Sequence, residues 1–283
     1  DEVEIEIDPL NNEKGQVLSL FERKNTFLRW NVKGRCPQLL ASNLDYLILV
    51  TTPDEPPFRP RFTDRALAQA EHQGIKPIIV CNKWDLAEKM QSDGRDSLFE
   101  EIDKRLNIWE ELGYTVLRIS AKTGEGMIEF AQLLEDHLSA FVGQSGVGKS
   151  SLINVMDNSC VLKTGSLSKK YGRGNHTTTK GSLIHLQLNE SLMDGIQGRK
   201  ANIIDTPGIR RFVLDDIQAD DVALYFREIE PFIGKCKFGL GCKHDTEPDC
   251  AVKNAVEEGL ITPERYDSWY RISQEIRTGK WED

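Results

Sequence analysis

The sequence lacks any apolar stretch that approaches the roughly twenty residues of a membrane-spanning helix. It also lacks internal repeats and low-complexity tracts. Positive charge is in short supply, because 36 Lys and Arg face 45 Asp and Glu, for a net charge of −9. Phosphate contacts require local positive charge, so this balance argues against broad, nonspecific nucleic-acid binding. We expect a cytoplasmic protein that has no membrane partner and works as a monomer.

Two segments depart from the acidic average and leave room for a basic patch. Residues 14–35 contain six Lys and Arg and one Glu, and residues 163–180 contain five Lys and Arg and no acidic residue. Either segment could face the phosphates of a nucleic acid. Ordinary charge segregation on an acidic protein is the alternative.

A phosphate-binding pattern lies in the middle of the chain, where residues 143–150 match G-x-x-x-x-G-K-[ST]. Its glycines let backbone N–H groups turn toward a β-phosphate, its Lys reaches the β- and γ-phosphates, and its Ser ligates magnesium. An apolar strand over residues 139–142 and a helix over 151–156 give the strand–loop–helix setting that the motif needs. A glycine-rich turn is the alternative. The predicted phosphate-binding residues are Gly143, Gln144, Ser145, Gly146, Val147, Gly148, Lys149, Ser150 and Ser151.

A guanine-reading signature, N-K-x-D, precedes the phosphate loop, whereas ordinary GTPases have the reverse order. Asn82, Lys83 and Asp85 follow the apolar run 78–81, at the carboxyl end of a predicted buried strand, where open α/β sheets bind ligands. An Asp there can accept hydrogen bonds from the ring N–H and the exocyclic amine of guanine, which adenine does not offer as a pair. Ser120, Ala121 and Lys122 resemble the companion loop that caps the guanine carbonyl. Ordinary turn residues at a strand end are the alternative for Asn82 and Asp85.

The magnesium and γ-phosphate elements follow downstream. Asp205 and Gly208 fit the D-x-x-G element, in which Asp holds the magnesium shell and Gly senses the γ-phosphate. Thr177 supplies the hydroxyl expected of a first switch, so Ser150, Thr177 and Asp205 are the predicted magnesium ligands. Lys149 and Thr177 are also predicted to act in catalysis.

The position after D-x-x-G lacks the water-positioning Gln that Ras-like GTPases carry there, because it is occupied by Ile209. An isoleucine cannot hydrogen-bond a nucleophile, so another group must orient the attacking water. His176 is the predicted water-positioning residue. A loop histidine without a catalytic role is the alternative. Unassisted hydrolysis should be slow, which leaves room for activation by a partner.

Three of the six cysteines gather with a histidine in the pattern C-x5-C-x-H-x5-C. Cys236, Cys242, His244 and Cys250 offer three thiolates and one imidazole, a set suited to a closed, tetrahedral structural zinc site. Disulfides are the weaker alternative, because three clustered cysteines cannot all pair with one another. Nearby, the segment 265–271 could contact RNA, although packing of Trp269 against the zinc module explains it equally well.

The motif order and the cysteine cluster together resemble the circularly permuted GTPases, most closely the RsgA family. That resemblance implies an α/β fold, namely a circularly permuted P-loop GTPase domain over residues 41–212 with a doubly wound, mostly parallel sheet. It also implies an OB-fold β-barrel over 1–40, incomplete at its N-terminus, and a helical zinc-binding module over 213–283. The helix ending near Leu138 runs so directly into the next strand that we expect residues to be absent there.

The resemblance further implies a GTP hydrolase that switches between GTP and GDP states during late maturation of the small ribosomal subunit, with Mg²⁺ and Zn²⁺ as bound ions. The expected partners are the small ribosomal subunit and its rRNA, with the subunit stimulating hydrolysis. Two alternatives remain open at this point. One is a GTP-dependent metallochaperone, whose Cys/His cluster would deliver metal. The other is a non-catalytic RNA-binding adaptor that holds nucleotide without turnover.

Overall fold

A six-stranded sheet organises the fold of this computed structural model, which describes residues 1–31, 36–160, 182–206 and 212–281. The strand order is β7-β6-β5-β8-β10-β9. Every neighbouring pair is parallel except β10 with β9, which confirms the predicted mostly parallel sheet. The strands are β5 (Tyr46–Thr51), β6 (Lys76–Cys81), β7 (Thr115–Arg118), β8 (Leu138–Gly143), β9 (Ser182–Gln187) and β10 (Lys200–Asp205).

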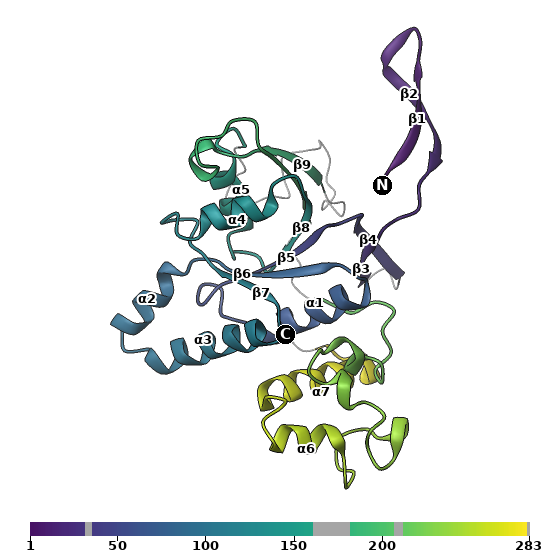
Figure 1. Cartoon of the computed structure of the whole chain (residues 1–283), viewed down its shortest axis with the longest axis vertical. Helices are drawn as coiled ribbons and strands as arrows, with labels where there is room; N and C mark the ends of the chain where they lie inside the picture. Colours follow the sequence, from purple (N-terminus) through teal and green to yellow (C-terminus); the bar gives the residue numbers. More distant parts are fainter. Residues whose placement is uncertain (32–35, 161–181, 207–211, 282–283) are drawn as a thin grey trace.

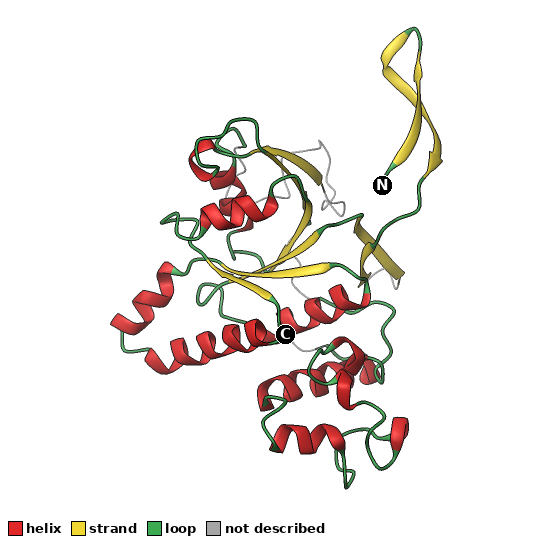
Figure 2. Cartoon of the chain, in the orientation of Figure 1, coloured by secondary structure: helices red, strands yellow, loops and turns green. Residues whose placement is uncertain are grey.

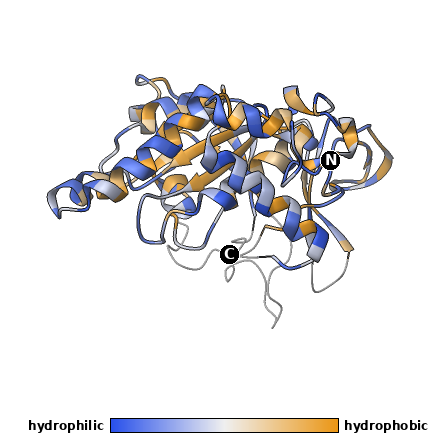
Figure 3. Ribbon diagram, turned by 90° about the horizontal axis from the view of Figure 1, so that it is seen from below, coloured by the Kyte–Doolittle hydropathy of each residue, from blue (hydrophilic) through white to orange (hydrophobic). Residues whose placement is uncertain are grey.

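Helices cover both faces of this sheet, so the core has two layers. Alternate residues of β5 point to opposite faces, as strand geometry requires, and Leu47 and Leu49 join one buried cluster while Ile48 and Val50 join the other. Helices α1 (Pro60–His72) and α3 (Asp96–Glu111) pack in the first cluster, and α4 (Met127–Leu134) and α5 (Lys149–Met156) pack in the second. Hydrophobic strands accordingly lie between helices with hydrophilic outer faces (Figure 3).

The chain reverses direction across the sheet between β5 and β8. From β5 it runs outward through β6 to β7, and it then returns to the other side of β5 as β8. Ligands of open α/β sheets bind at the carboxyl ends of the strands at such a switch point. The segments that leave β5, β6 and β8 at that edge are residues 52–59, the start of α2 (Asp85–Ser92) and the phosphate loop.

The expectation of absent residues near Leu138 is wrong. Helix α4 ends at Leu134 rather than near Leu138, and the three residues Glu135–His137 make the turn into β8. Asp136 adopts a left-handed conformation with φ of 57°, and its N–H donates to the carbonyl oxygen of Lys200 at 2.8 Å. This left-handed residue reverses the chain within three residues, which helical periodicity does not anticipate.

The N-terminal strands form two separate ribbons. The hairpin of β1 (Val3–Asp8) and β2 (Asn11–Leu20) stands away from the body, and β3 (Thr26–Asn31) pairs with β4 (Cys36–Ser42) close to the sheet (Figure 1). The described residues of this region make no closed barrel, and their assignment to part of an OB-fold stays a prediction. Strand β4 also crosses the boundary expected at residue 40.

The C-terminal region is helical, as expected, with short 3-10 turns that precede its two α-helices in the chain (Figure 2). It contains α6 (Ala251–Glu257), α7 (Pro263–Thr278) and the turns η2 (Val222–Tyr225), η3 (Glu230–Phe232) and η4 (Gly239–Gly241); a further turn, η1 (Glu190–Leu192), precedes β10. Thr262 precedes α7 as expected, but its side chain makes no capping hydrogen bond. Among the described residues, we find no helix that is long and apolar enough to cross a membrane.

A buried ionic cluster joins this region to α1. Asp64 on α1 is fully buried and accepts hydrogen bonds from Arg105 and Trp109 of α3 and from Arg265 and Ser268 of α7. Burial disfavours the ionised carboxylate, but the two arginines hold the pKa of Asp64 below its ordinary value. This cluster fixes α7 against the sheet-covering helices.

Two residues of the α7 segment that could contact RNA are interior, whereas Arg271 of the same segment is exposed. Arg265 is 1% exposed and also pairs with Glu228 at 2.5 Å. Trp269 is 4% exposed, and its ring centroid lies 5.8 Å from that of His244. The packing alternative holds for these two residues.

Candidate functional site

The phosphate loop has the backbone that its glycines were expected to allow. Gly146 and Gly148 have φ of 90° and 94°, in the left-handed region that side chains disfavour. A Cβ on Gly148 would lie 2.3 Å from Asn82 Nδ2, and a Cβ on Gly143 would lie 2.4 Å from the Val50 carbonyl oxygen. The loop thus needs glycine at 146 for its conformation, at 143 for space and at 148 for both.

Lys149 lies folded over this loop. Its Nζ donates to the carbonyl oxygens of Gly143 at 2.8 Å and Gln144 at 2.9 Å, and the residue is 6% exposed. Burial lowers the pKa of Lys149 to about 8, while nearby Asp205 opposes the shift. The ammonium group is therefore held at the loop, where phosphate oxygens could replace the two carbonyls. Ser150 follows at the start of α5 and is also buried, whereas Ser145 is exposed on the loop.

Asn82 ties the phosphate loop to the base-reading segments. Its Nδ2 donates to the Val147 carbonyl oxygen at 2.8 Å, and its Oδ1 accepts from the Ala121 N–H at 3.1 Å. The side chain is 1% exposed, so neither bond competes with water. One asparagine therefore joins three segments that are far apart in sequence, and it sets the spacing between the base and phosphate ends of the site.

Asp85, the predicted guanine reader, lies beside the companion loop. Its Oδ1 accepts from the Ser120 hydroxyl at 2.8 Å, and its Oδ2 lies 3.6 Å from Lys122 Nζ. The carboxylate is mostly buried and the lysine mostly exposed. These contacts fix the orientation of the Asp85 carboxylate at the edge of the sheet, beside the companion loop.

The segment after β5 is a part of this site to which the sequence assigned no role. Lys83 donates from Nζ to the carbonyl oxygen of Glu55, and Pro56 Cδ lies 3.7 Å from where a Cβ on Gly146 would be. This turn-rich segment therefore adjoins both the guanine signature and the phosphate loop. Its position after a central strand, between two motif-bearing strands, is the signal that could have found it.

The two predicted magnesium ligands among the described residues, Ser150 and Asp205, come from α5 and β10. Asp205 ends β10, and its Oδ1 is buried without a hydrogen-bond partner among the described residues. A buried carboxylate oxygen without a donor fits a hard cation. Ser150 supplies the hydroxyl that the phosphate-loop motif places on magnesium. His176, Thr177 and Gly208, the other predicted switch residues, lie outside the described residues.

Magnesium-dependent nucleotide binding is expected to weaken as the pH falls through about 6. Burial raises the pKa of Asp205 to about 6, with Lys149 opposing the rise, and only the ionised carboxylate binds the cation. Affinity should drop by up to about tenfold per pH unit below that pKa. Titrations of GDP with and without Mg²⁺ between pH 5 and 8 measure this effect. Asp205→Asn, which removes the titration of this carboxylate and keeps those of the nucleotide and of Lys149, is the control, and identical profiles for parent and variant would contradict the assignment.

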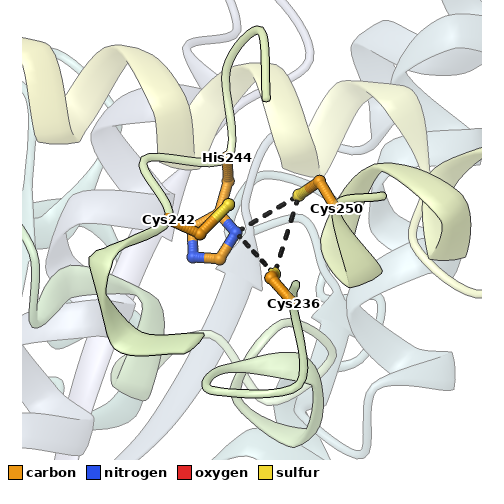
Figure 4. A group of neighbouring side chains, drawn as sticks. All are labelled: Cys236, Cys242, His244 and Cys250. Atoms are coloured by element: carbon orange, nitrogen blue, oxygen red, sulfur yellow. Dashed lines mark hydrogen bonds between the residues drawn. The ribbon is translucent and has the colours of Figure 1, made fainter. Parts of the chain in front are cut away.

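The Cys/His cluster is assembled in the C-terminal region as its spacing predicted. Cys236, Cys242, His244 and Cys250 are all buried, and their ligand atoms lie within 4.8 Å of one another (Figure 4). His244 Nδ1 lies 3.4 Å from Cys236 Sγ and 3.3 Å from Cys250 Sγ. Burial raises the pKa of the Cys250 thiol, the effect that a bound cation would reverse. The donor set fits tetrahedral zinc with Nδ1 as the histidine ligand.

Hydrogen bonds from neighbouring residues also hold the cluster in place. The Ala251 N–H at the start of α6 donates to Cys236 Sγ at 3.3 Å, and the Tyr266 hydroxyl donates to the His244 carbonyl oxygen at 2.6 Å. Hydrogen bonds of this kind orient metal ligands and tune their basicity. Helices α6 and α7 thus both hold the cluster.

Comparisons with known proteins agree over most of the chain. The sequence model of the RsgA GTPase family matches residues 20–215. Small ribosomal subunit biogenesis GTPase RsgA of Pseudomonas putida is 38% identical over 258 residues, which cover 91% of this chain and 69% of that protein. The Haemophilus influenzae protein of the same name is 41% identical over 241 residues, which cover 85% of this chain and 64% of its own length.

Solved structures give the same result for the fold. YjeQ from Thermotoga maritima superposes with a TM-score of 0.71 at 28% identity, over 97% of this chain and 82% of that one. YloQ, described as a circularly permuted GTPase, superposes with a TM-score of 0.69 at 26% identity, over 99% of this chain and 81% of that one. With the family match covering the phosphate loop, the base-reading segments and Asp205, the chain belongs to the RsgA family of GTPases.

Proposed function

We propose that this chain hydrolyses GTP and uses its GTP and GDP states to time its attachment to a maturing small ribosomal subunit. The observation that supports nucleotide binding is the pair of hydrogen bonds made by the Asn82 side chain, which connect the phosphate loop with Ala121 of the companion loop. The ribosomal part rests on the similarity to the small ribosomal subunit biogenesis GTPases RsgA. A role in the maturation of ribosome precursors further supports a cytoplasmic location, and we propose that the protein is a monomer.

The residue roles follow from the geometry and the motifs. Backbone N–H groups of the phosphate loop and Lys149 bind the phosphates, while Asp85 reads guanine and Asn82 and Lys83 shape its pocket. Ser120, Ala121 and Lys122 cap the base. Ser150, Thr177 and Asp205 hold Mg²⁺, which when bound neutralises charge on the β- and γ-phosphates. His176 orients the water, Thr177 assists through the same switch, and Gly208 senses the γ-phosphate.

Three parts carry out this work in the proposal. Residues 41–212 bind nucleotide, residues 1–40 form the part of an OB-fold that contacts rRNA, and residues 213–283 form the zinc module. Zinc held by the Cys/His cluster is a structural ion, because four protein ligands leave no open position for chemistry. Exposed Lys14 on β2 supplies positive charge for rRNA phosphates, and Arg23 and Lys24 in the loop before β3 add to it when they exchange their partners Asp1 and Asp45 for phosphate.

Asp85→Asn is expected to change base specificity. A carboxylate accepts from the ring N–H and amine of guanine, whereas an amide also offers donors, which suit the carbonyl that xanthine has in place of the amine. GTP affinity should fall at least about tenfold, given roughly 1–3 kcal/mol for a bidentate base contact, and XTP affinity should rise. Competition of GTP and XTP for the parent and the variant measures the change. Unchanged preference for GTP would remove Asp85 from the base site.

Purified small ribosomal subunits are expected to accelerate GTP turnover, whereas large subunits are not. Attachment should also be tighter with a non-hydrolysable GTP analogue than with GDP, because a switch needs different affinities in its two states. Turnover assays and co-sedimentation with each subunit test both statements. Equal affinity of the two nucleotide states would end the switch proposal. Turnover indifferent to both subunits would favour the metallochaperone, and binding without turnover would favour the adaptor.

A further inference from the structure

A cleft that the nucleotide function does not use lies where three helices meet. It has a volume of about 360 Å³ and is lined by the residues leading into α1, by the middle of α3 and by the first turns of α7. None of its lining residues belongs to the phosphate loop, the base-reading motifs or the Cys/His cluster. Volumes of roughly 300–1,000 Å³ are typical of small-molecule sites, whereas a peptide-binding groove is longer and shallower.

One side of the cleft is apolar. Phe58, Phe62 and Ile108 line it, and Ile108 is 6% exposed. Phe58 is fixed by its contact with Trp109, at 6.1 Å between ring centroids, and Phe62 is fixed by Phe212 at 6.3 Å. The two aromatic side chains are thus held in place by the core rather than by each other, which leaves their remaining surface available to a planar or aliphatic ligand.

The other side of the cleft is cationic at the beginning of α1. This helix starts at Pro60 with no acidic residue in its first turn and no side-chain cap, so its positive end is not neutralised by its own sequence. Arg59 immediately precedes it, is exposed and has no carboxylate partner among the described residues. An acidic group of a ligand would meet both the guanidinium and the helix end.

The floor of the cleft contains a buried hydrogen-bond donor that has no acceptor among the described residues. Arg105 lines it, is only 6% exposed, and binds Asp64 through its NH2 group. Its Nε is buried without a hydrogen-bond partner among the described residues. Buried donors are nearly always satisfied, so an acceptor or a water that reaches this depth is expected.

Two of the three acidic residues of the lining are already paired with cations, Glu264 with Lys104 at 2.5 Å and Asp267 with Arg271 at 2.9 Å. Glu101, the third, is exposed on α3. The charges that remain next to the apolar side are therefore the positive ones of Arg59 and the start of α1 and the negative one of Glu101.

We propose that this cleft binds a small organic anion whose apolar part lies on Phe58, Phe62 and Ile108 and whose acidic group lies at Arg59 and the start of α1. Because the walls come from the GTPase domain and from α7, such a ligand bridges the two and stabilises their contact. The site is separate from the nucleotide site, so its occupation adds to guanine-nucleotide binding rather than competing with it.

The test uses 1-naphthoate as the anionic probe and 1-naphthamide as its uncharged counterpart, on the full chain saturated with GDP and Mg²⁺. Methyl NMR of Ile108 and calorimetry report binding. We expect saturable naphthoate binding that shifts the Ile108 methyl signals and is at least about tenfold tighter than that of the amide. Arg59→Glu should weaken naphthoate binding about tenfold or more, and because an acid favours a helix start, this variant should fold. Lys235→Glu makes the same charge change outside the cleft and should bind normally.

Four results would overturn the proposal. Absence of a saturable Ile108 shift would exclude a site, and equal binding of naphthoate and naphthamide would exclude an anion. If Arg59→Glu and Lys235→Glu weaken naphthoate binding equally, the effect arises from the overall charge of the protein and not from the cleft. Tighter binding of a short acidic peptide than of naphthoate would replace the small ligand by a protein segment.

Discussion

His176→Ala is expected to lower small-subunit-stimulated GTP turnover by about 10²–10⁴-fold, the range that a positioned acid–base group contributes. The reason lies in Ile209, which occupies the place after D-x-x-G and cannot hydrogen-bond a water. The loss should appear in kcat, with GTP affinity within about twofold of the parent, because water positioning acts in the transition state.

A second histidine provides a matched control for this variant. His185 on β9 is exposed, and its Nδ1 lies 2.6 Å from Asn202 Oδ1 at the antiparallel edge of the sheet. His185→Ala should therefore turn over GTP like the parent. If His176→Ala retains full stimulation by small subunits, the ribosomal assignment stands and another group orients the water.

Removal of zinc is expected to unfold the C-terminal module. Structural zinc sites contribute an apparent 10–16 kcal/mol or so at neutral pH, whereas a whole domain is stable by about 5–15 kcal/mol. Cys236→Ser removes a ligand that lies 3.4 Å from His244 Nδ1 and accepts the Ala251 N–H. The variant should lose its bound zinc and the ordered environment of Trp269.

Metal analysis and near-ultraviolet circular dichroism measure these two losses. Cys36→Ser, which changes an exposed cysteine outside the cluster, is the control and should keep one zinc per chain. A Cys236→Ser protein that retains stoichiometric zinc would contradict the assigned ligand set. Zinc that exchanges freely in the folded parent would favour a metal-delivery role over a structural one.

Local motifs made the nucleotide elements predictable, because their chemistry depends on residues that are adjacent in sequence. The phosphate loop, its flanking strand and helix, and the Cys/His spacing are of this kind, and the parallel sheet followed from the apolar runs between them. The two hydrogen bonds of the Asn82 side chain could not be predicted from the sequence, because their partners Val147 and Ala121 become neighbours only after the strands pair. The same holds for the contact of Lys83 with Glu55.

The burial of charged side chains was the second feature that could not be predicted from the sequence. The order of basic and aromatic residues in α7 is the same whether the helix faces RNA or the protein interior, and Arg265 is interior because Asp64 and Glu228 lie opposite it. Neither partner is adjacent in sequence. The end of α4 was misplaced for another reason, since the three polar residues 135–137 of the turn could equally continue a helix and only the left-handed conformation of Asp136 ends it.

The ionic cluster around Asp64 has a mechanical consequence. Moving α7 away from α1 would separate the fully buried Asp64 carboxylate from Arg265 and leave Arg105 as its remaining ionic partner. Breaking a buried ion pair costs about 3–5 kcal/mol, which equals or exceeds the coupling energies of about 1–3 kcal/mol that are available to most ligand-driven switches. The C-terminal module is therefore attached rigidly to the helices that cover the sheet. A small ribosomal subunit that binds this module would directly set the orientation of the nucleotide-binding edge. Any conformational change on GTP hydrolysis has to occur outside the contact between α1, α3 and α7.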